Sequence, residues 1–406
     1  MKIAFLGNIN NHPFHVAWYF KQQGHDVTIY IEADQKVLLH RPEALTYGIK
    51  YPYPDWIIEE RRLDRSLWMH FPSVFARKII KQLNTCDAVV VNHYGHRFLP
   101  YLKKEIIKVC MFTGGDLETM ADYESVLKMR MNAPKLKFFP GFLKRWYANF
   151  SVDQLRRGIR SADLISYFPK GLLPLGDRLL NEIFEGKPFN KYEHYAMFID
   201  GITYAEPPRN NPVKVLNLAR FLWKEPFPPG VHYLENKGND IMIEGIAAYI
   251  RKTGQKLDVQ FIEKGNHIEE SKALIRELGF EDMVTWHKEM PMYKLVEKIE
   301  EADIVFDQLG NHLVGVGIFG MIKGRPLIAN MRPEIITKIT KEELPVCNAT
   351  TAAEVAAWLE KLVNDPELRR TIGLQSSKFA LRHFDIKKQA KYFLDFITDN
   401  IKQKNV

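Results

Sequence analysis

Glycines gather in the stretch of residues 305–330, VFDQLGNHLVGVGIFGMIKGRPLIAN. An apolar run ends there in Asp307 and Gln308, and Gly315 and Gly317 follow in a loop before a short predicted helix. Glycines at such a junction let backbone N–H groups approach an anion closely, and the helix N-terminus adds a favourable dipole. An ordinary flexible strand-to-helix turn is the alternative, and this segment alone does not decide between the two.

Cationic side chains precede this loop at two points. Arg220 follows a predicted strand, and Lys237 stands at the start of a predicted helix. An arginine and a lysine that converge near a helix N-terminus can neutralise a diphosphate leaving group without a metal. Surface cations are the alternative, which we prefer for Lys224. Gly265 and His287 also follow predicted strands, where loops could contact a nucleotide base.

The first half of the chain has polar loops of its own. Gly114, Gly115 and Asp116 follow a predicted strand; the glycines allow close backbone approach, and the aspartate could bind a sugar hydroxyl or cap the next helix. His93 and His96 follow the preceding strand and are candidates for substrate contact. Metal binding by this pair would need a further ligand, and none is evident nearby, so we expect no metal.

The elements that must carry these residues alternate in type along the chain. Residues 2–6 predict a strand, residues 13–23 a helix, and residues 25–31 a second strand. Strand, glycine-bearing turn, helix and strand form a βαβ unit, which indicates a parallel sheet. Ligands of open α/β sheets bind outside the carboxyl ends of the strands, so we look for chemistry in the loops that follow them.

The alternation continues on both sides of an irregular segment. Residues 201–213, GITYAEPPRNNPV, are rich in proline and asparagine and lack helical periodicity, which is typical of an interdomain linker. Further strands are predicted at residues 88–91, 109–112, 164–167, 214–217, 257–262, 284–286, 304–306 and 327–329. Helices are predicted towards the end of the chain at residues 352–363, 367–379 and 386–401.

Length and composition favour two domains. A chain of 406 residues is too long for one core. Together with the alternating elements, this predicts an α/β fold of two Rossmann-like, doubly wound domains with a ligand cleft between them. We expect a first domain at residues 1–205, a second at residues 206–385, and a terminal helix at residues 386–406 that packs back towards the first.

Cysteine usage, hydropathy and charge bear on location and partners. Three scattered cysteines, no signal-peptide pattern and no apolar run of about 18 residues predict a cytoplasmic protein. The net charge is +8, and residues 67–81 and 134–150 interleave cations with aromatic side chains. That pattern suits partly buried helices or a bilayer interface, and two such segments favour contact with the inner face of a membrane. We expect no nucleic-acid partner, because no recognised module is present.

Short motifs add a family resemblance. They are LNLAR ending at Arg220, NKG at residues 236–238, the turn at residues 278–280, EADIVFDQ, GRPLIAN, and NDPELRRTIG at residues 364–373. In their order and spacing, the chain resembles the GT-B glycosyltransferases over nearly its whole length, particularly the family-4-like group that uses nucleotide sugars. The resemblance implies two Rossmann-like domains that face across a cleft and a helical C-terminal tail.

The resemblance also implies an activity and roles for residues. It implies a hexosyltransferase of polysaccharide biosynthesis that needs no cofactor. The second domain would bind a nucleotide-diphosphate sugar, and the first would bind a glycan or lipid-linked acceptor. Arg220 and Lys237 would hold the donor diphosphate, and Asp116 would orient the acceptor. The donor-binding candidates are Asp307, Gln308, Gly315, Val316, Gly317, Gly265 and His287. The acceptor-binding candidates are Gly7, Asn8, Asn10, His93, His96, Gly114 and Gly115.

Two departures from the family pattern bear on the mechanism. Where the family usually has two glutamates, this sequence has Asn311 and Phe319, and where it usually has His-Gly-Ser-Asp, residues 113–116 are Thr-Gly-Gly-Asp. These losses leave open whether the reaction retains or inverts stereochemistry. Two alternatives therefore stay open: a nucleotide-sugar epimerase of the same fold, and a non-catalytic nucleotide-sugar or glycan-binding protein, which the missing carboxylates motivate.

Overall fold

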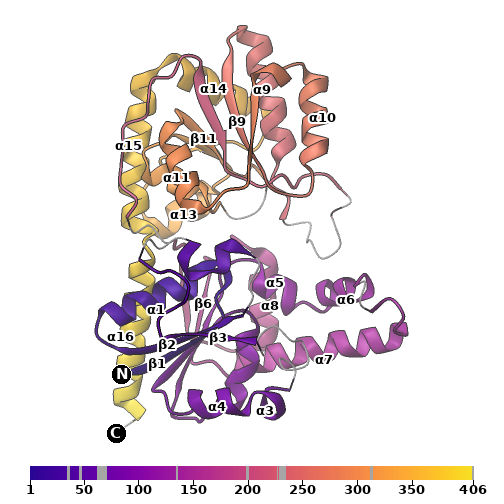
Figure 1. Ribbon diagram of the computed structural model, residues 1–406, viewed down its shortest axis with the longest axis vertical. Helices are drawn as coiled ribbons and strands as arrows, with labels where there is room; N and C mark the ends of the chain where they lie inside the picture. The colour runs from indigo at the N-terminus through magenta and orange to yellow at the C-terminus, as the bar shows by residue number, and fades with distance from the viewer. Residues whose placement is uncertain are drawn as a thin grey trace. The chain divides into compact units, whose positions relative to one another are not determined.

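The computed structural model describes residues 1–33, 37–44, 48–61, 71–133, 136–197, 201–225, 227, 235–310 and 314–404. The chain divides into two compact units. Unit 1 comprises residues 1–198 together with residues 386–406, and unit 2 comprises residues 199–385. Each unit is built around one β-sheet with helices packed against it (Figure 1).

Unit 1 contains a seven-stranded sheet whose pairings are all parallel. Its strands are β1 (Lys2–Leu6), β2 (Asp26–Glu32), β3 (Ile57–Glu60), β4 (Ala88–Val91), β5 (Ile107–Met111), β6 (Leu164–Tyr167) and β7 (Lys191–Glu193). Their order is β3-β2-β1-β4-β5-β6-β7. The direction of winding reverses between β1 and β4, and at such a point open α/β sheets form a ligand crevice.

The central strands of unit 1 are apolar because both of their faces are covered. β4 has the sequence AVVV, and all four residues are buried. The helices of the unit are α1 (His12–Gln22), α3 (Pro72–Phe75), α4 (Arg77–Leu83), α5 (Asp116–Met120), α6 (Tyr123–Met131), α7 (Gly141–Arg160), α8 (Pro174–Ile183) and α16 (Ile386–Lys404). Among the described residues, the loops contain the 3-10 segments η1 (Ile9–Asn11), η2 (Leu38–His40), η3 (Pro42–Ala44) and η5 (His93–Tyr101).

The last helix, α16, belongs to unit 1 and lies beside α1 (Figure 1). Its residues Phe393 and Ile397 are fully buried in the same apolar cluster as Phe14 of α1. The Gln389 side chain donates a hydrogen bond to Ser166 Oγ on β6 at 2.9 Å. Residues from both ends of the sequence therefore form one core.

Unit 2 contains a six-stranded parallel sheet in the order β10-β9-β8-β11-β12-β13. Its strands are β8 (Val213–Asn217), β9 (Leu257–Glu263), β10 (Val284–Lys288), β11 (Ile304–Phe306), β12 (Leu327–Ala329) and β13 (Cys347–Asn348). Its helices are α9 (Asn239–Thr253), α10 (Ile268–Leu278), α11 (Met292–Glu301), α12 (Gly317–Ile322), α13 (Pro333–Thr340), α14 (Ala352–Asn364) and α15 (Pro366–His383). Winding reverses between β8 and β11, so the loops after these two strands adjoin the expected ligand crevice.

The predicted α/β class, with two Rossmann-like sheets and a helical C-terminal tail, is confirmed. Each predicted strand is present, with bounds that differ by at most a few residues. Three further strands, β3, β7 and β13, occupy sheet edges and were not predicted.

Candidate functional site

The loops that follow β8 and β11 meet at Lys237 in unit 2. The Lys237 N–H donates to the Leu222 carbonyl at 2.7 Å, and the Lys237 carbonyl accepts from the Leu309 N–H at 2.9 Å. Two glycines permit this approach, because a Cβ on Gly238 would lie 2.7 Å from the backbone nitrogen of Gly310. Gly238 also has a φ of 64°, which glycine adopts without steric strain. Two distant sequence regions are thus brought into one place.

Four charged side chains stand together around this contact. The Arg220 guanidinium pairs with the Glu235 carboxylate. Lys237 is buried, and burial, followed by repulsion from Arg220, lowers the pKa of its ammonium group to about 7. The charges of Glu235 and Asp307 oppose that shift. An anion placed here would meet two cations, one of which would take up a proton as the anion binds.

The glycine loop before α12 binds a carboxylate of the protein itself. Asp307 Oδ2 accepts hydrogen bonds from the Gly317 N–H at 2.8 Å and the Gly315 N–H at 3.1 Å, and Oδ1 accepts from the Gln308 N–H at 2.8 Å. Burial raises the pKa of Asp307, and these hydrogen bonds and Lys237 offset part of the rise. A phosphate that used the two glycine amides would have to displace the Asp307 carboxylate.

Gln308 has a different environment from its neighbour Asp307. Its side chain is 3% exposed, and its Oε1 atom has no hydrogen-bond partner among the residues that the structure describes. An unsatisfied buried acceptor costs free energy, of the order of 1–3 kcal/mol, and a ligand hydroxyl or N–H group would remove that cost. Gln308 is therefore placed to bind a polar ligand group next to Lys237.

The other donor candidates have protein contacts of their own. Gly265 bridges to Phe221 with a φ of 117°, and a Cβ at this position would collide with the Phe221 backbone. His287 on β10 hydrogen bonds through Nε2 with the Gln260 side chain on β9. Val316 is half-buried directly before α12. Contact of these residues with a nucleotide stays a prediction.

Of the two positions where the family usually has glutamates, the structure describes one. Phe319 is buried within α12 at 1% exposure, so it packs in the core of unit 2. Asn311 lies outside the described residues. The described position therefore offers no polar group to a ligand.

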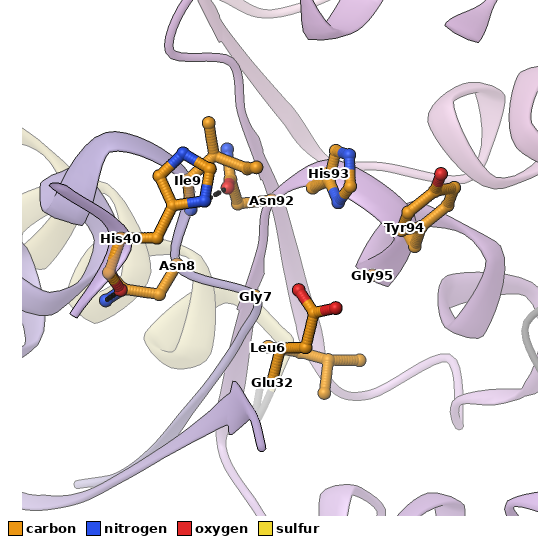
Figure 2. A pocket seen from close by; sticks show the side chains of 10 residues that line it. All are labelled: Leu6, Gly7, Asn8, Ile9, Glu32, His40, Asn92, His93, Tyr94 and Gly95. Carbon is orange, nitrogen blue, oxygen red and sulfur yellow. Dashed lines mark hydrogen bonds between the residues drawn. The ribbon is translucent and has the colours of Figure 1, made fainter. Parts of the chain in front are cut away.

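A pocket lies at the carboxyl ends of β1, β2 and β4 in unit 1 (Figure 2). It is at the point where the winding of this sheet reverses. Its lining residues are Leu6, Gly7, Asn8, Ile9, Glu32, His40, Asn92, His93, Tyr94 and Gly95. Three predicted acceptor-binding residues, Gly7, Asn8 and His93, therefore lie in one pocket.

Asn92 holds the loops around this pocket together. Its Oδ1 accepts from the Ile9 N–H at 2.9 Å, and its amide donates to the Met111 carbonyl at 2.8 Å and to Asp116 Oδ2 at 3.3 Å. A Cβ on Gly7 would lie 2.5 Å from the Asn92 carbonyl oxygen, so glycine is required there. The pocket is thus built on strand ends that are rigidly joined.

The backbone beside the pocket is strained at three residues other than glycine. Asn10, Asn11 and His93 have φ values of 55°, 61° and 55°. Such left-handed conformations cost roughly 1–3 kcal/mol each and concentrate at functional sites. Burial, followed by the charges of His96 and His40, lowers the pKa of His93 to about 3. Its imidazole is therefore neutral near pH 7 and able to accept a hydrogen bond.

The remaining acceptor candidates, Asn10, His96, Gly114 and Gly115, are not among the residues that line the pocket. His96 is 1% exposed and stacks on Phe112, with ring centroids 4.7 Å apart. The Asn10 amide donates to the Thr113 carbonyl at 3.0 Å, which ties the first loop to the loop of Gly114 and Gly115. His96 is therefore not one of the residues that line the pocket, although its Nδ1 hydrogen bonds with the backbone carbonyl of His93, which does line it.

Asp116 is the first residue of α5, whose N-cap is Gly115 and makes no side-chain cap hydrogen bond, so the alternative role of Asp116 as a helix cap is not observed. Its Oδ1 accepts from the Thr113 N–H at 3.2 Å. Burial raises the pKa of Asp116 to about 7, while backbone hydrogen bonds act in the opposite direction. The carboxyl group therefore caps a turn and is also linked through Asn92 to the pocket.

Sequence reasoning missed three residues that position these sites: Asn92, Glu235 and His267. His267 Nδ1 accepts from the backbone N–H groups of Trp223 and Lys224, each at 3.0 Å, and so fixes the loop that follows Arg220. Glu235 could have been found from the sequence, because it is an acidic residue two positions before Lys237. No local pattern distinguishes Asn92 or His267.

The described ranges contain no group of three or more His, Cys, Asp or Glu side chains that is arranged to hold a metal ion. In the same part of the chain, no helix combines the length and the apolar composition that a membrane span requires. Cys86, Cys110 and Cys347 are free.

Comparison with solved structures identifies the fold. Sucrose-phosphate synthase from Thermosynechococcus elongatus matches with a TM-score of 0.62 and 11% identity, over 98% of this chain and 99% of that chain. A glycosyltransferase from Rickettsia africae matches with a TM-score of 0.60 and 12% identity, over 99% of each chain. A lipopolysaccharide outer core galactosyltransferase matches with a TM-score of 0.52 and 13% identity, over 97% of this chain and 99% of that chain.

These similarities show that the chain has the GT-B fold, as its motifs predicted. Each of the two sheets described above corresponds to one of the two Rossmann-like domains of that fold. No protein-family model matches the sequence, and no curated protein matches it.

Proposed function

We propose that the chain is a cytoplasmic, hexosyl-type glycosyltransferase that moves a sugar from a nucleotide-diphosphate sugar to a hydroxyl group of a glycan or lipid-linked acceptor. The observation that carries this proposal is the convergence of Arg220 and Lys237 beside Gln308 at the switch point of the unit 2 sheet. The fold supports it, because matching structures include a sugar-phosphate synthase and two sugar transferases.

The chemistry assigned to unit 2 is stabilisation of the leaving group. Negative charge grows on the donor diphosphate as its bond to the sugar breaks, and Arg220 and Lys237 would stabilise that charge without a metal. Lys237 would become fully protonated as the diphosphate approaches, because a nearby anion raises its lowered pKa. The unpartnered Oε1 of Gln308 would accept a hydrogen bond from the nucleotide sugar.

The chemistry assigned to unit 1 is placement of the acceptor. The neutral imidazole of His93 would accept a hydrogen bond from the acceptor hydroxyl in the pocket, which Gly7 and Asn8 also line. Asp116, with a pKa raised to about 7, would orient the acceptor through Asn92.

The proposal is tested by a thermal-shift screen of UDP, GDP, ADP, TDP and CMP and their common sugar conjugates, followed by transfer assays with the nucleotide sugar that responds. Stabilisation by one nucleotide series is expected, and the Arg220→Ala/Lys237→Ala variant should lose both the response and transfer while its circular dichroism is unchanged. A Lys224→Ala variant is the matched control. Transfer that survives the double substitution refutes the proposal.

The same assays separate the two alternatives. A new sugar isomer formed from the donor alone identifies an epimerase. Donor binding without transfer across a broad acceptor panel identifies a binding protein.

A further inference from the structure

Large apolar side chains are exposed at one end of α7 in unit 1. Helices α6 and α7 lie side by side and extend away from the sheet of this unit (Figure 1). Beside the join between them, Phe138, Phe139, Phe142 and Trp146 are 94%, 54%, 71% and 60% exposed. Single exposed apolar residues are ordinary, but a contiguous group marks a surface that something else covers.

The exposed side chains form one connected face. Phe142, Trp146 and Phe150 are four residues apart, so they lie along one side of α7. The Trp146 and Phe150 rings stack with centroids 5.6 Å apart, and Phe150 stacks on Phe71 at the start of α3 with centroids 5.2 Å apart. Val74 of α3 is 53% exposed and extends the face.

The exposed face of α7 does not contribute to the packing between α6 and α7. The opposite side of α7 makes the packing contacts, where Ala148 and Val152 form a buried cluster with Val126 of α6. The helix pair is therefore held together by its inner side chains. The aromatic face remains available to a partner.

The charged residues of the two segments that form the face are all basic, and the nearest acidic residue of α7 on this side is Asp153, one turn beyond Phe150. Lys137 and Arg145 are exposed beside the aromatic residues, and Arg77 and Lys78 are exposed at the start of α4. Residues 71–83 and 136–150 contain no aspartate or glutamate. We call this surface the α7 patch: Phe71, Val74, Phe138, Phe139, Phe142, Leu143 and Trp146, with Lys137, Arg145, Arg77 and Lys78. Residues 67–70 and 134–135, which belong to the aromatic and basic segments predicted from the sequence, lie outside the described residues.

We propose that the α7 patch docks this protein on the surface of an anionic lipid bilayer. Aromatic rings insert at the depth of the headgroups, and lysine and arginine side chains meet anionic lipid there. A second copy of the chain fits less well, because symmetric pairing through this face would bring Lys137 and Arg145 towards the same cations of the other copy. The proposal goes beyond the glycosyltransferase assignment and does not depend on it.

The far end of α7 is fixed to the loop that carries the unit 1 pocket. A Cβ on Gly158 would collide with the His96 carbonyl, and Arg97 donates to Ser151 Oγ at 2.7 Å. His96 and Arg97 belong to η5, which begins with the pocket residue His93. A docked patch would therefore hold the pocket in a defined place relative to the bilayer, as a lipid-linked acceptor would require.

The test is co-sedimentation of the full chain with vesicles of phosphatidylcholine alone and of phosphatidylcholine mixed with phosphatidylglycerol. The wild type should bind the mixed vesicles preferentially. Phe138→Ser/Phe142→Ser/Trp146→Ser should lower the partition coefficient about 100-fold or more, at about tenfold for each ring. Its control is Tyr293→Ser/Ile339→Ser, which removes two exposed apolar side chains of unit 2.

A second pair of variants tests the charges. Lys137→Glu/Arg145→Glu should lower binding to the mixed vesicles about 30-fold or more, at about fivefold for each lost cation. Lys338→Glu/Lys378→Glu, which reverses two exposed lysines of unit 2, is the control and should bind as the wild type does.

Several outcomes would overturn the proposal. The wild type could fail to bind the mixed vesicles, or could bind both kinds of vesicle equally. The patch variants could bind as well as the wild type. The patch could also support a dimer in a protein that does not bind vesicles. Nucleotide-induced thermal shifts, measured on the same variants, should not change. If no nucleotide shifts the melting temperature of the wild type or of any variant, the assignment of the donor site is refuted, and the result with vesicles still stands.

Discussion

The pKa of Lys237 makes a quantitative prediction about donor binding. In the free protein, burial and Arg220 lower this pKa to about 7, while Glu235 and Asp307 oppose the shift. A bound diphosphate would raise the pKa well above that value, because it adds negative charge beside the ammonium group. Binding must therefore be coupled to uptake of a proton, and substitution of Lys237 by methionine should remove the coupling.

The magnitude follows from the fraction of Lys237 that is already protonated. About nine-tenths of it carries the proton at about pH 6 and about one-tenth at about pH 8, so the dissociation constant should rise roughly tenfold between them, or about 1.4 kcal/mol. The ligand should be a nucleotide sugar, whose doubly esterified diphosphate does not titrate in this range. A terminal phosphate would add its own ionisation near pH 6.

Isothermal titration calorimetry at several pH values measures this dependence. The Lys237→Met variant should bind more weakly, by about 1.5–3 kcal/mol for a lost charged hydrogen bond, with an affinity that does not change across the range. Lys224→Met, which alters an exposed lysine of the same loop, should keep the wild-type slope. An identical slope in the Lys237→Met variant, or wild-type binding that tightens as the pH rises, would refute the reasoning.

Three further predictions concern stability. Burial raises the pKa of the Glu118 carboxyl group from 4.5 to about 8. Its contribution to stability is therefore present below pH 4.5 and is lost as the pH rises towards 8. Over that pH range, urea denaturation should show the free energy of unfolding of Glu118→Gln increasing relative to that of the wild type. Gly310→Ala would place a Cβ against the Asn236 carbonyl and should lower the free energy of unfolding by about 1–3 kcal/mol. A Cβ at Gly315 meets nothing within 4 Å, so Gly315→Ala should change the free energy of unfolding by no more than about 0.5 kcal/mol. Equal losses of stability in the two variants would contradict the packing argument. Phe393→Ala should destabilise unit 1 by about 3–5 kcal/mol and leave unit 2 folded, and hydrogen exchange that reports equal loosening of both units would exclude this.

The sequence predicted the strands that are buried on both faces and one edge strand, β10, but missed the edge strands β3, β7 and β13. β4 has the sequence AVVV, and this short apolar run is best interpreted as a buried strand. β3 is IIEE and β7 is KYE, and each lies at an edge of the unit 1 sheet. One side of an edge strand faces solvent or a loop, so selection for apolar residues is weak and the pattern that predicts a strand is lost.

Prediction of the sites had a similar limit. The rule that ligands bind outside the carboxyl ends of parallel strands was enough to select the loops that carry Arg220, Lys237 and Asp307. The partner of the Gly315 amide could not be predicted in this way. Whether it meets a ligand or the Asp307 carboxylate depends on the path of a loop within a few ångströms, and no periodicity in the sequence encodes that path.

The place of α16 has a consequence for how the protein is made. Domains generally fold as units during synthesis, beginning with the N-terminal one. Here Phe14 of α1 is buried with Phe393 of α16, which the ribosome adds only after the whole of unit 2. One side of α1 in a nascent unit 1 therefore stays uncovered until α16 has been synthesised. Unit 2, whose residues are contiguous, can complete its fold first.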